Sequence, residues 1–462
     1  MLAERHATSE LAGFVAALRL ERVPAAVVET AKRALMDSLG CGVFGAQMEW
    51  GRIVRDFAVD QGSRPVATLL ADGARVSAGH AALANGTAIH GFELDDLINK
   101  DHVHPGAVIV SAALAAAEAA GASGERLIAG IIAGYEVMSR VGGALGNDQS
   151  VRGFHTTGIA GPVGAAAAAG VVRGLTAQQL ANALGIAVAF SSGVKQFAQS
   201  EGGMIKRLHG GHAAESGVVA ADLAARSFTA AQSPLEGHMG LLEVVGGAAA
   251  RVEPLTASLG EDWALTHLWV KMYPCCALIH STLQAIEKLR AEHHFAADDV
   301  ARVRIGASKR LVDQNSNPAP ADTVSAQYSV LYCAAIALAA DPKDPRHYAT
   351  DRLFDPEQRA RMKLVESFVD PKVDAAYPKA FGAAVAIELR DGRTVSHEVL
   401  QPHGTEFDPA GTAEVEEKFR ILVGGQSRVR ADDVLDALRT IEGAPTLGAL
   451  TDVLRRPGVT AP

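Results

Sequence analysis

Ionisable side chains gather in short segments of this chain that are rich in Gly, Ala or Pro. The first segment holds Asp95 and Asp96, and His104 follows directly before Pro105-Gly106. Carboxylates, and an imidazole whose pKa lies near neutrality, are the groups that general acid–base catalysis uses. A helix that begins at Pro105 would also direct free N–H groups toward a bound carboxylate. The alternative is structural: the aspartates cap the helix and the histidine lies in solvent.

Two further segments contribute nitrogen groups. His155 stands before Thr156-Thr157 and an Ala-rich run, and Lys206, Arg207 and His209 lie close together farther along the chain. Helical spacing would place Lys206 and His209 on one face, where basic groups could bind an anion. The structural alternatives are a hydrogen-bonded core histidine at His155, a threonine N-cap, and an exposed basic turn.

The last segment begins at Lys271 and continues to Cys276, with His280 one helical turn later. We expect Lys271 on a short apolar strand, where a buried lysine needs a partner. The adjacent Cys275 and Cys276 more often pack than react. Tyr328 falls in a predicted apolar helix, where a buried tyrosine usually just finds a hydrogen bond. Together these segments predict a cleft between two domains. The predicted substrate-binding residues are Lys206, Arg207, His209, Lys271, Cys276 and His280.

Metal and cofactor sites are not indicated. His209 and His212 have helical spacing, but no third ligand is placed by spacing. The four cysteines form no Cys-x-x-Cys pair, which argues against zinc knuckles and iron–sulfur clusters. We therefore predict no metal and no cofactor.

Composition narrows the partners and the compartment. A formal net charge of −9 disfavours nucleic acid and anionic membranes, because phosphate binding needs a basic face. The most apolar stretch, 159–172, is shorter than the roughly 20 residues that span a bilayer. Few cysteines fit a reducing compartment. These features predict a cytoplasmic protein with a small-molecule partner, no nucleic acid and no membrane.

The secondary-structure elements that must position these residues show two kinds of hydrophobic pattern along the chain. Residues from about 8 to 260 read as successive helices, whose small residues allow close packing, whereas alternating strands appear after residue 263. An Asp-Gly pair at 391–392 between two alternating runs predicts a hairpin. The fold class is therefore mainly α, with an all-helical domain (1–262 and 405–462) and a smaller α+β domain (263–404). Predicted helices are 23–44, 108–120, 127–141, 161–173, 177–190, 213–225, 277–293, 323–340, 414–422 and 431–440, and predicted strands are 300–305, 384–389 and 394–400.

Several of these motifs, in this order, resemble those of the MmgE/PrpD family over nearly the whole chain. That family includes 2-methylcitrate dehydratases, cis-aconitate decarboxylases and iminodisuccinate epimerases. The matching segments are Glu93-Leu94-Asp95-Asp96 with His104-Pro105-Gly106, Gly134-Tyr135-Glu136, Gly153 to Gly158, Lys206 with Leu208-His209, Leu235-Glu236-Gly237, Lys271 to Cys276, and Gln327-Tyr328.

The resemblance implies a large helical domain, a smaller α+β lid, a homodimer and an active site between the domains. The sequence also differs from better-known members of that family at positions that concern the substrate. Gly106-Ala107-Val108 follows His-Pro where methylcitrate dehydratases have Ser-Asp-Asn, Cys276 stands near a histidine of the itaconate-forming decarboxylases, and Leu97 replaces a small polar residue. By the resemblance the catalytic residues are Asp95, Asp96, His104, His155, Lys206, Lys271 and Tyr328.

The reactions of that family share one difficulty, since negative charge develops at a carbon next to a carboxylate. Fixed cations such as Lys206 and Lys271 could stabilise that charge, and His104 could transfer the proton. We predict a metal-independent, dehydratase-like lyase acting on a small di- or tricarboxylic acid. The alternatives are a decarboxylase or an epimerase of the same fold, or a non-catalytic helical binding protein.

Overall fold

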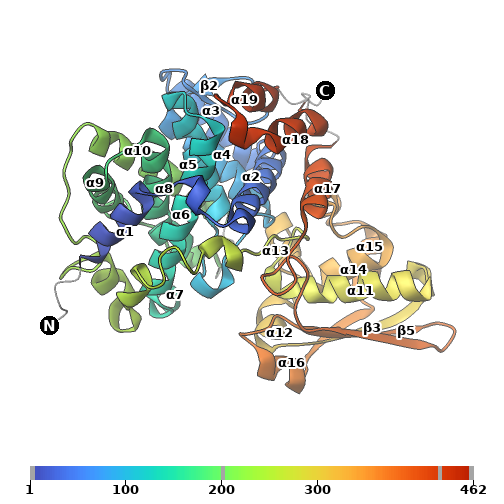
Figure 1. The fold of residues 1–462 in the computed structure, drawn as a ribbon. Helices are drawn as coiled ribbons and strands as arrows, with labels where there is room; N and C mark the ends of the chain where they lie inside the picture. Colours follow the sequence, from blue (N-terminus) through green and yellow to red (C-terminus); the bar gives the residue numbers. More distant parts are fainter. Residues whose placement is uncertain (1–5, 199–202, 425–428, 457–462) are drawn as a thin grey trace. The chain divides into compact units, whose positions relative to one another are not determined.

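A computed structural model describes residues 6–198, 203–424 and 429–456. The ends of the predicted helical domain, 1–5 and 457–462, lie outside the described residues. The chain divides into two compact units. Unit 1 comprises Met1–Gly91, Asp95–Trp269 and Thr412–Pro462, and unit 2 comprises Phe92–Leu94 and Val270–Gly411. The fold is mainly α, as predicted (Figure 1).

Unit 1 is built from helices, with one short two-stranded ribbon, β1 (Ala67–Thr68) and β2 (Arg75–Val76). Helices α4, α6 and α9 begin at Ser or Thr N-caps. The side-chain oxygen of each cap accepts from a backbone N–H group of the first turn that has no partner within the helix. The helices are α1 (Ala7–Ala16), α2 (Ala25–Gly45), α3 (Glu49–Asp60), α4 (Ala78–Ile89), α5 (Pro105–Ala120), α6 (Gly124–Leu145), α7 (Asp148–Val151), α8 (Thr156–Arg173), α9 (Ala177–Val188), α10 (Ile205–Ala225), α17 (Thr412–Val423), α18 (Ala431–Arg439) and α19 (Gly448–Leu454).

Helix α8 forms the centre of unit 1 and packs against α5, α6, α9 and α10. Small residues set how closely these helices approach. A Cβ at Gly217 of α10 would lie 2.2 Å from the Cβ of Ala165, so the two helices need hydrogen at that position. Pro162 has no N–H to donate to the Gly158 carbonyl inside α8, and the N–H of Ser192 donates to that carbonyl instead.

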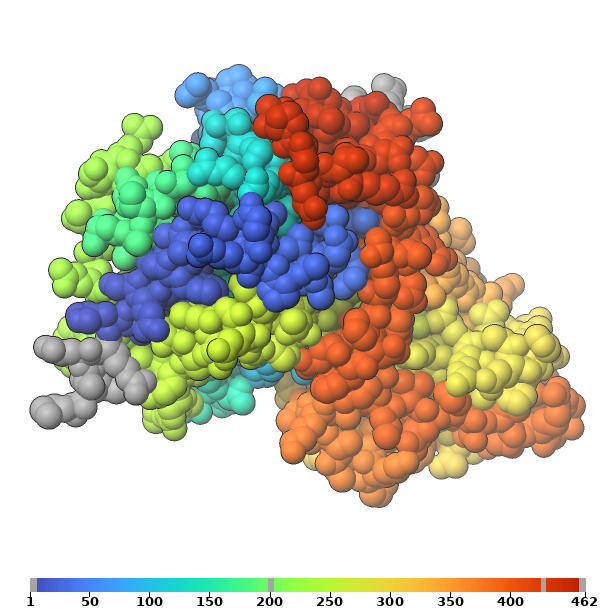
Figure 2. Space-filling model, viewed as in Figure 1, coloured from blue at the N-terminus to red at the C-terminus, as the bar shows by residue number. Residues whose placement is uncertain are grey.

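The C-terminal helices return to unit 1. Figure 2 shows this segment (red) lying against the N-terminal helices (blue). Helix α17 packs on α2, where a Cβ at Gly40 would meet the ring of Phe419 at 3.0 Å. Buried Lys418 forms an ion pair of 2.5 Å with buried Asp37.

Unit 2 contains a four-stranded sheet in the order β4-β3-β5-β6. Strand β3 pairs parallel with β4 and antiparallel with β5, and β5 and β6 form the predicted Asp-Gly hairpin. Alternate residues of β5 are buried, and α11 packs on β5 and β6. The elements are α11 (His280–His293), β3 (Val300–Ala307), α12 (Lys309–Asn315), α13 (Thr323–Gln327), α14 (Val330–Ala339), α15 (Pro356–Met362), β4 (Val365–Val369), α16 (Pro371–Ala376), β5 (Ala383–Leu389) and β6 (Thr394–Val399).

Two local predictions in unit 2 are wrong. The helix predicted over 323–340 is interrupted, because the side chain of Ser329 caps a new helix by accepting from the N–H of Tyr332. Tyr328 therefore lies in the break between α13 and α14. Lys271 is not on a strand but in an irregular segment that follows the isolated bridge between Leu97 and Trp269.

The described part of the chain holds no helix long and apolar enough to cross a membrane.

Candidate functional site

The segment between α4 and α5 carries the acidic pair and His104. Helix α5 begins at Pro105 with His104 as its N-cap. The N–H of Gly106 donates to Oδ1 of Asp96 at 2.8 Å, and the hydroxyl of Tyr135 donates to Oδ2 at 2.6 Å. The carboxylate at this helix terminus is thus that of Asp96, in the position where a substrate carboxylate was considered.

Asp96 is fully buried, and burial raises its pKa to about 7, against the opposing effect of the Tyr135 hydrogen bond. The buried carboxylate of Asp37 raises this pKa further, while Lys418 pairs with Asp37 behind it. Asp96 therefore exchanges its proton near neutral pH without being open to solvent.

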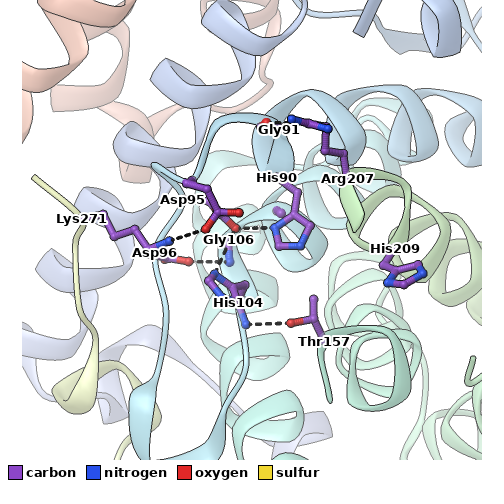
Figure 3. A network of polar contacts seen from close by, with 12 residues as sticks. His90, Gly91, Asp95, Asp96, His104, Gly106, Thr157, Arg207, His209 and Lys271 are labelled. Atoms are coloured by element: carbon purple, nitrogen blue, oxygen red, sulfur yellow. Dashed lines mark hydrogen bonds and ion pairs between the residues drawn. The ribbon is translucent and has the colours of Figure 1, made fainter. Parts of the chain in front are cut away.

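Asp95 lies between two imidazoles (Figure 3). Its Oδ2 atom is 2.7 Å from Nδ1 of His90 and 3.4 Å from Nδ1 of His104. Burial alone would raise the pKa of Asp95, but the two histidines outweigh it and hold that pKa well below its ordinary value. The two neighbouring aspartates therefore have opposite states near neutrality, with Asp95 ionised and Asp96 able to hold a proton.

His104 has the geometry of an acid–base group. Its backbone N–H donates to Oγ1 of Thr157 at 3.2 Å, which ties the start of α5 to the start of α8. With Nδ1 directed at the Asp95 carboxylate, the proton of the neutral ring belongs on Nδ1, which makes Nε2 the basic nitrogen of that ring. The side chain of His104 is 18% exposed, whereas that of His90 has no exposure.

His155 and His209 form a second imidazole pair. Their Nδ1 atoms are 2.9 Å apart, so one ring donates and the other accepts. Burial lowers the pKa of His209 to about 4 and holds that of His155 well below its ordinary value, with His90 and Lys206 adding to both effects. Both rings are neutral at pH 7. Phe197 closes this pair, with ring centroids 5.3 Å from His155 and 5.7 Å from His209.

The basic residues at the start of α10 have different surroundings. Lys206 is half-buried and near enough to the His155–His209 pair to depress both pKa values. Arg207 is buried, its guanidinium lies 4.0 Å from the ring of Trp50, and its Nε donates to the Gly91 carbonyl at 2.8 Å. Arg207 therefore holds the chain just before the acidic segment, whereas Lys206 lies near the imidazole pair of His155 and His209.

In unit 2 a buried carboxylate joins Lys271 and Tyr328. Oε2 of Glu93 accepts from Nζ of Lys271 at 3.3 Å and from the Tyr328 hydroxyl at 3.2 Å. The backbone φ angle of Glu93 is 56°, in the left-handed region that residues other than glycine seldom adopt. The amide of Gln327 donates to the Phe92 and Pro274 carbonyls at 2.7 and 2.9 Å, which keeps residues 92–94 in this unit.

The other two predicted binding residues of unit 2 differ in exposure. Cys276 is half-buried and is close enough to the Tyr328 hydroxyl to help raise its pKa, although burial and Glu93 contribute more. His280 is buried, with its ring edge-on to Tyr273 at 5.2 Å. Cys276 therefore joins the Lys271 group, and the contact of His280 is with the core.

The structure brings into these groups two residues that were not predicted, His90 and Glu93. Glu93 lies in the acidic segment singled out from the sequence, whereas His90 lies outside it, at the end of α4. One sequence signal pointed to His90: it stands five residues before Asp95 in the chain.

Among the described residues, His90, Asp95 and His104 form one group whose donor atoms lie within 4.8 Å of one another. Such a group could hold a metal ion. A tetrahedral zinc with bonds of about 2.0–2.1 Å would separate its ligand atoms by roughly 3.3 Å. The 2.7 Å separation between His90 and Asp95 is shorter than this and fits a shared proton.

Comparisons with known proteins cover most of the chain. A model of the MmgE/PrpD N-terminal domain matches residues 9–252, and a model of the MmgE/PrpD C-terminal domain matches residues 273–438. The chain is 28% identical over 447 residues to a cis-aconitate decarboxylase-like protein of Aspergillus oryzae, with 91% of each chain covered. It is 26% identical to a cis-aconitate decarboxylase of Aspergillus terreus, with 97% of each chain covered, and 26% identical to the human cis-aconitate decarboxylase, with 97% of this chain and 95% of the relative covered.

Proposed function

The chain belongs to the MmgE/PrpD family, and from this premise we propose that it is a lyase acting on the carbon next to a carboxylate in a small di- or tricarboxylic acid. The observation that carries the proposal is the Asp95–His104 pair. A buried, ionised carboxylate faces Nδ1 of a partly exposed histidine at 3.4 Å. That arrangement orients the ring, and Nε2, the basic nitrogen of the neutral ring, is the atom proposed to transfer the proton.

Proton transfer alone does not make such a reaction fast, because charge builds up on the substrate. Lys206 and Lys271 are the proposed cations for the substrate carboxylates and for the developing negative charge. The His155–His209 pair and the Tyr328 hydroxyl are proposed as uncharged hydrogen-bond donors to the substrate. Both imidazoles and the phenol are neutral near pH 7.

Decarboxylation is the first reaction to test, because the relatives from Aspergillus terreus and human, each of which matches 97% of this chain, are cis-aconitate decarboxylases. In that reaction the electrons of the broken C–C bond pass to the neighbouring carbon as carbon dioxide leaves. The imidazolium of His104 would then protonate that carbon. Dehydration uses the same residues in a different order: neutral His104 removes a proton, and a neutral donor protonates the departing hydroxyl.

A purified sample in D2O, examined by proton NMR with a panel of acids, tests the proposal. The panel contains cis-aconitate, citrate, 2-methylcitrate and iminodisuccinate, each with and without EDTA. We expect product signals or deuterium at the carbon next to a carboxylate, and the acid that responds identifies the substrate.

Exchanging His104 for alanine identifies the reacting group. We expect turnover to fall by about 10²–10⁴-fold, the usual contribution of a positioned acid–base residue. The matched control is His102→Ala, which removes a neighbouring exposed histidine bonded to Asn147. Near-normal turnover in H104A would contradict the assigned role, and silence across the whole panel would favour a non-catalytic binding protein.

A further inference from the structure

We propose that His90 is a positioning residue that sets the basicity of His104 by sharing the carboxylate of Asp95. The inference rests on the proposed function insofar as His104 is the acid–base group. The geometry from which it starts is independent of the substrate, because all three side chains belong to unit 1.

The two imidazoles contact the same oxygen atom. Nδ1 of His90 is 2.7 Å from Oδ2 of Asp95, and Nδ1 of His104 is 3.4 Å from that oxygen. The His90 bond is the shorter one, and its ring is entirely buried. The rings of His90 and His104 lie edge to face, with centroids 5.3 Å apart. The two rings therefore face the same carboxylate oxygen, with His90 at hydrogen-bond distance and His104 farther away.

The other ring nitrogen of His90 indicates which tautomer the neutral ring adopts. Nε2 of His90 is buried and has no hydrogen-bond partner among the described residues. A buried N–H without an acceptor is costly, whereas an unprotonated ring nitrogen loses less on burial. The proton of His90 therefore belongs on Nδ1, where Asp95 accepts it. His90 thus donates its Nδ1 proton to the carboxylate that His104 also faces.

This donor weakens the hold of Asp95 on His104. A carboxylate that already accepts a short, buried hydrogen bond stabilises a neighbouring imidazolium less than one that faces it alone. Other ionisable groups of unit 1 near this cluster include Asp96, His155 at the start of α8, and Lys206 and His209 on α10. His155 and His209 are neutral, and the Asp95 carboxylate is the charged group that both His104 and His90 face.

Two substitutions distinguish the effect of losing the hydrogen-bond donor at Nδ1 from the effect of losing the volume of the ring. In His90→Asn the amide nitrogen takes the place of Nδ1 and keeps the hydrogen bond to Asp95. In His90→Gln the amide lies at the place of Nε2, so that bond is lost while polar volume is kept. His90→Leu removes both nitrogens and serves as a second loss variant if H90Q finds a new bond.

The readout is the titration of His104 by NMR in protein labelled with ¹³C at histidine Cε1, with the signal assigned by its absence in H104Q. We expect H90Q and H90L to raise the pKa of His104 by about 0.5–1 unit, and H90N to stay within about 0.3 unit of the wild type. In the Asp95→Asn background the difference between H90Q and H90N should vanish.

An unchanged His104 titration in folded H90Q and H90L would overturn the proposal, as would equal shifts in H90N and H90Q. The acidic limb of the pH profile of kcat/KM should move with the titration. If no acid is turned over, the lyase proposal fails while the titration still decides the role of His90. Thermal melts of each variant establish that it is folded.

Discussion

Adjacent aspartates in this protein differ because their partners differ. Asp95 accepts from imidazoles and stays ionised, whereas Asp96 accepts from a backbone N–H and a phenol and lies near the buried Asp37. Neither of the donors to Asp96 carries a charge that would compensate its burial. A single step along the chain thus separates a permanent anion from a group that titrates near neutrality, which is how proteins assign different roles to like residues.

Asp96 makes stability depend on pH, and Asp96→Asn should remove that dependence. Its folded pKa of about 7 lies above the unfolded value of about 3.9, so the folded state binds the extra proton. The contribution is fully present below about pH 4 and is lost as pH rises through 7. We expect the free energy of unfolding of D96N, relative to that of the wild type, to rise by up to about 1.4 kcal/mol per pH unit between about pH 4.5 and 6.5. Above about pH 8 this difference should be constant.

Urea unfolding at several pH values measures this slope. Asp95→Asn is the control with the opposite sign. The pKa of Asp95 is held well below its ordinary value, so its contribution is present above the unfolded pKa and is lost only in acid. The slope that the lost Asp95 carboxyl contributes to D95N therefore lies below about pH 4 and has the opposite sign, outside the range of about pH 4.5 to 6.5 used for D96N. A constant difference between D96N and the wild type over this range would show that Asp96 is not protonated in the fold.

At the scale of elements, a buried ion pair joins helix α17 to α2, two helices more than 350 residues apart in the chain. Lys418→Met should cost about 3–5 kcal/mol of unfolding free energy, because it leaves the Asp37 carboxylate buried without that cation. The double variant D37L/K418M should recover much of the loss, since apolar side chains tolerate the same surroundings.

Urea unfolding checks both variants, and an exposed pair provides the comparison. Lys372 and Glu398 are 2.6 Å apart on the surface of unit 2, and Lys372→Met should cost less than about 1 kcal/mol. Equal losses in K418M and K372M would mean that the buried pair contributes no more than a solvated one.

For the molecule as a whole, unit 1 is assembled from distant parts of the chain, and unit 2 is an insertion within it. A chain ending at residue 411 lacks α17–α19, and we expect it to lose the fixed tertiary structure of unit 1. Phe419 no longer covers α2 at Gly40, and the N–H of Ala71 loses its bond to the Leu454 carbonyl. Near-UV circular dichroism and solubility of this truncated protein test the expectation.

An insertion of two glycines at the exposed Asp391-Gly392 turn is the control for the truncation. The turn joins β5 and β6 at the surface, so unit 1 should keep its signal. A truncated chain with an intact near-UV spectrum would show that the C-terminal helices are dispensable for folding.

The residue pattern by itself determined the mainly α class, the β5–β6 hairpin and the principal helices. Apolar periodicity and Asp-Gly turn chemistry act over a few residues, so they can be read locally. It also indicated the segments that hold Asp95, His104, His155 and Lys206. Their types and glycine-rich surroundings, and the resemblance to a family that the comparisons confirm, were sufficient for that.

Only the tertiary structure decided what each of these groups contacts. Periodicity could not show that Ser329 would cap a new helix and interrupt the one predicted over 323–340. Nor could spacing show that Arg207 would stack on Trp50, or that His90 would share a carboxylate with His104. The physical reason is that hydrogen-bond partners and pKa values depend on burial and on atoms from other helices. Those are fixed by packing across long sequence separations, which no local pattern contains.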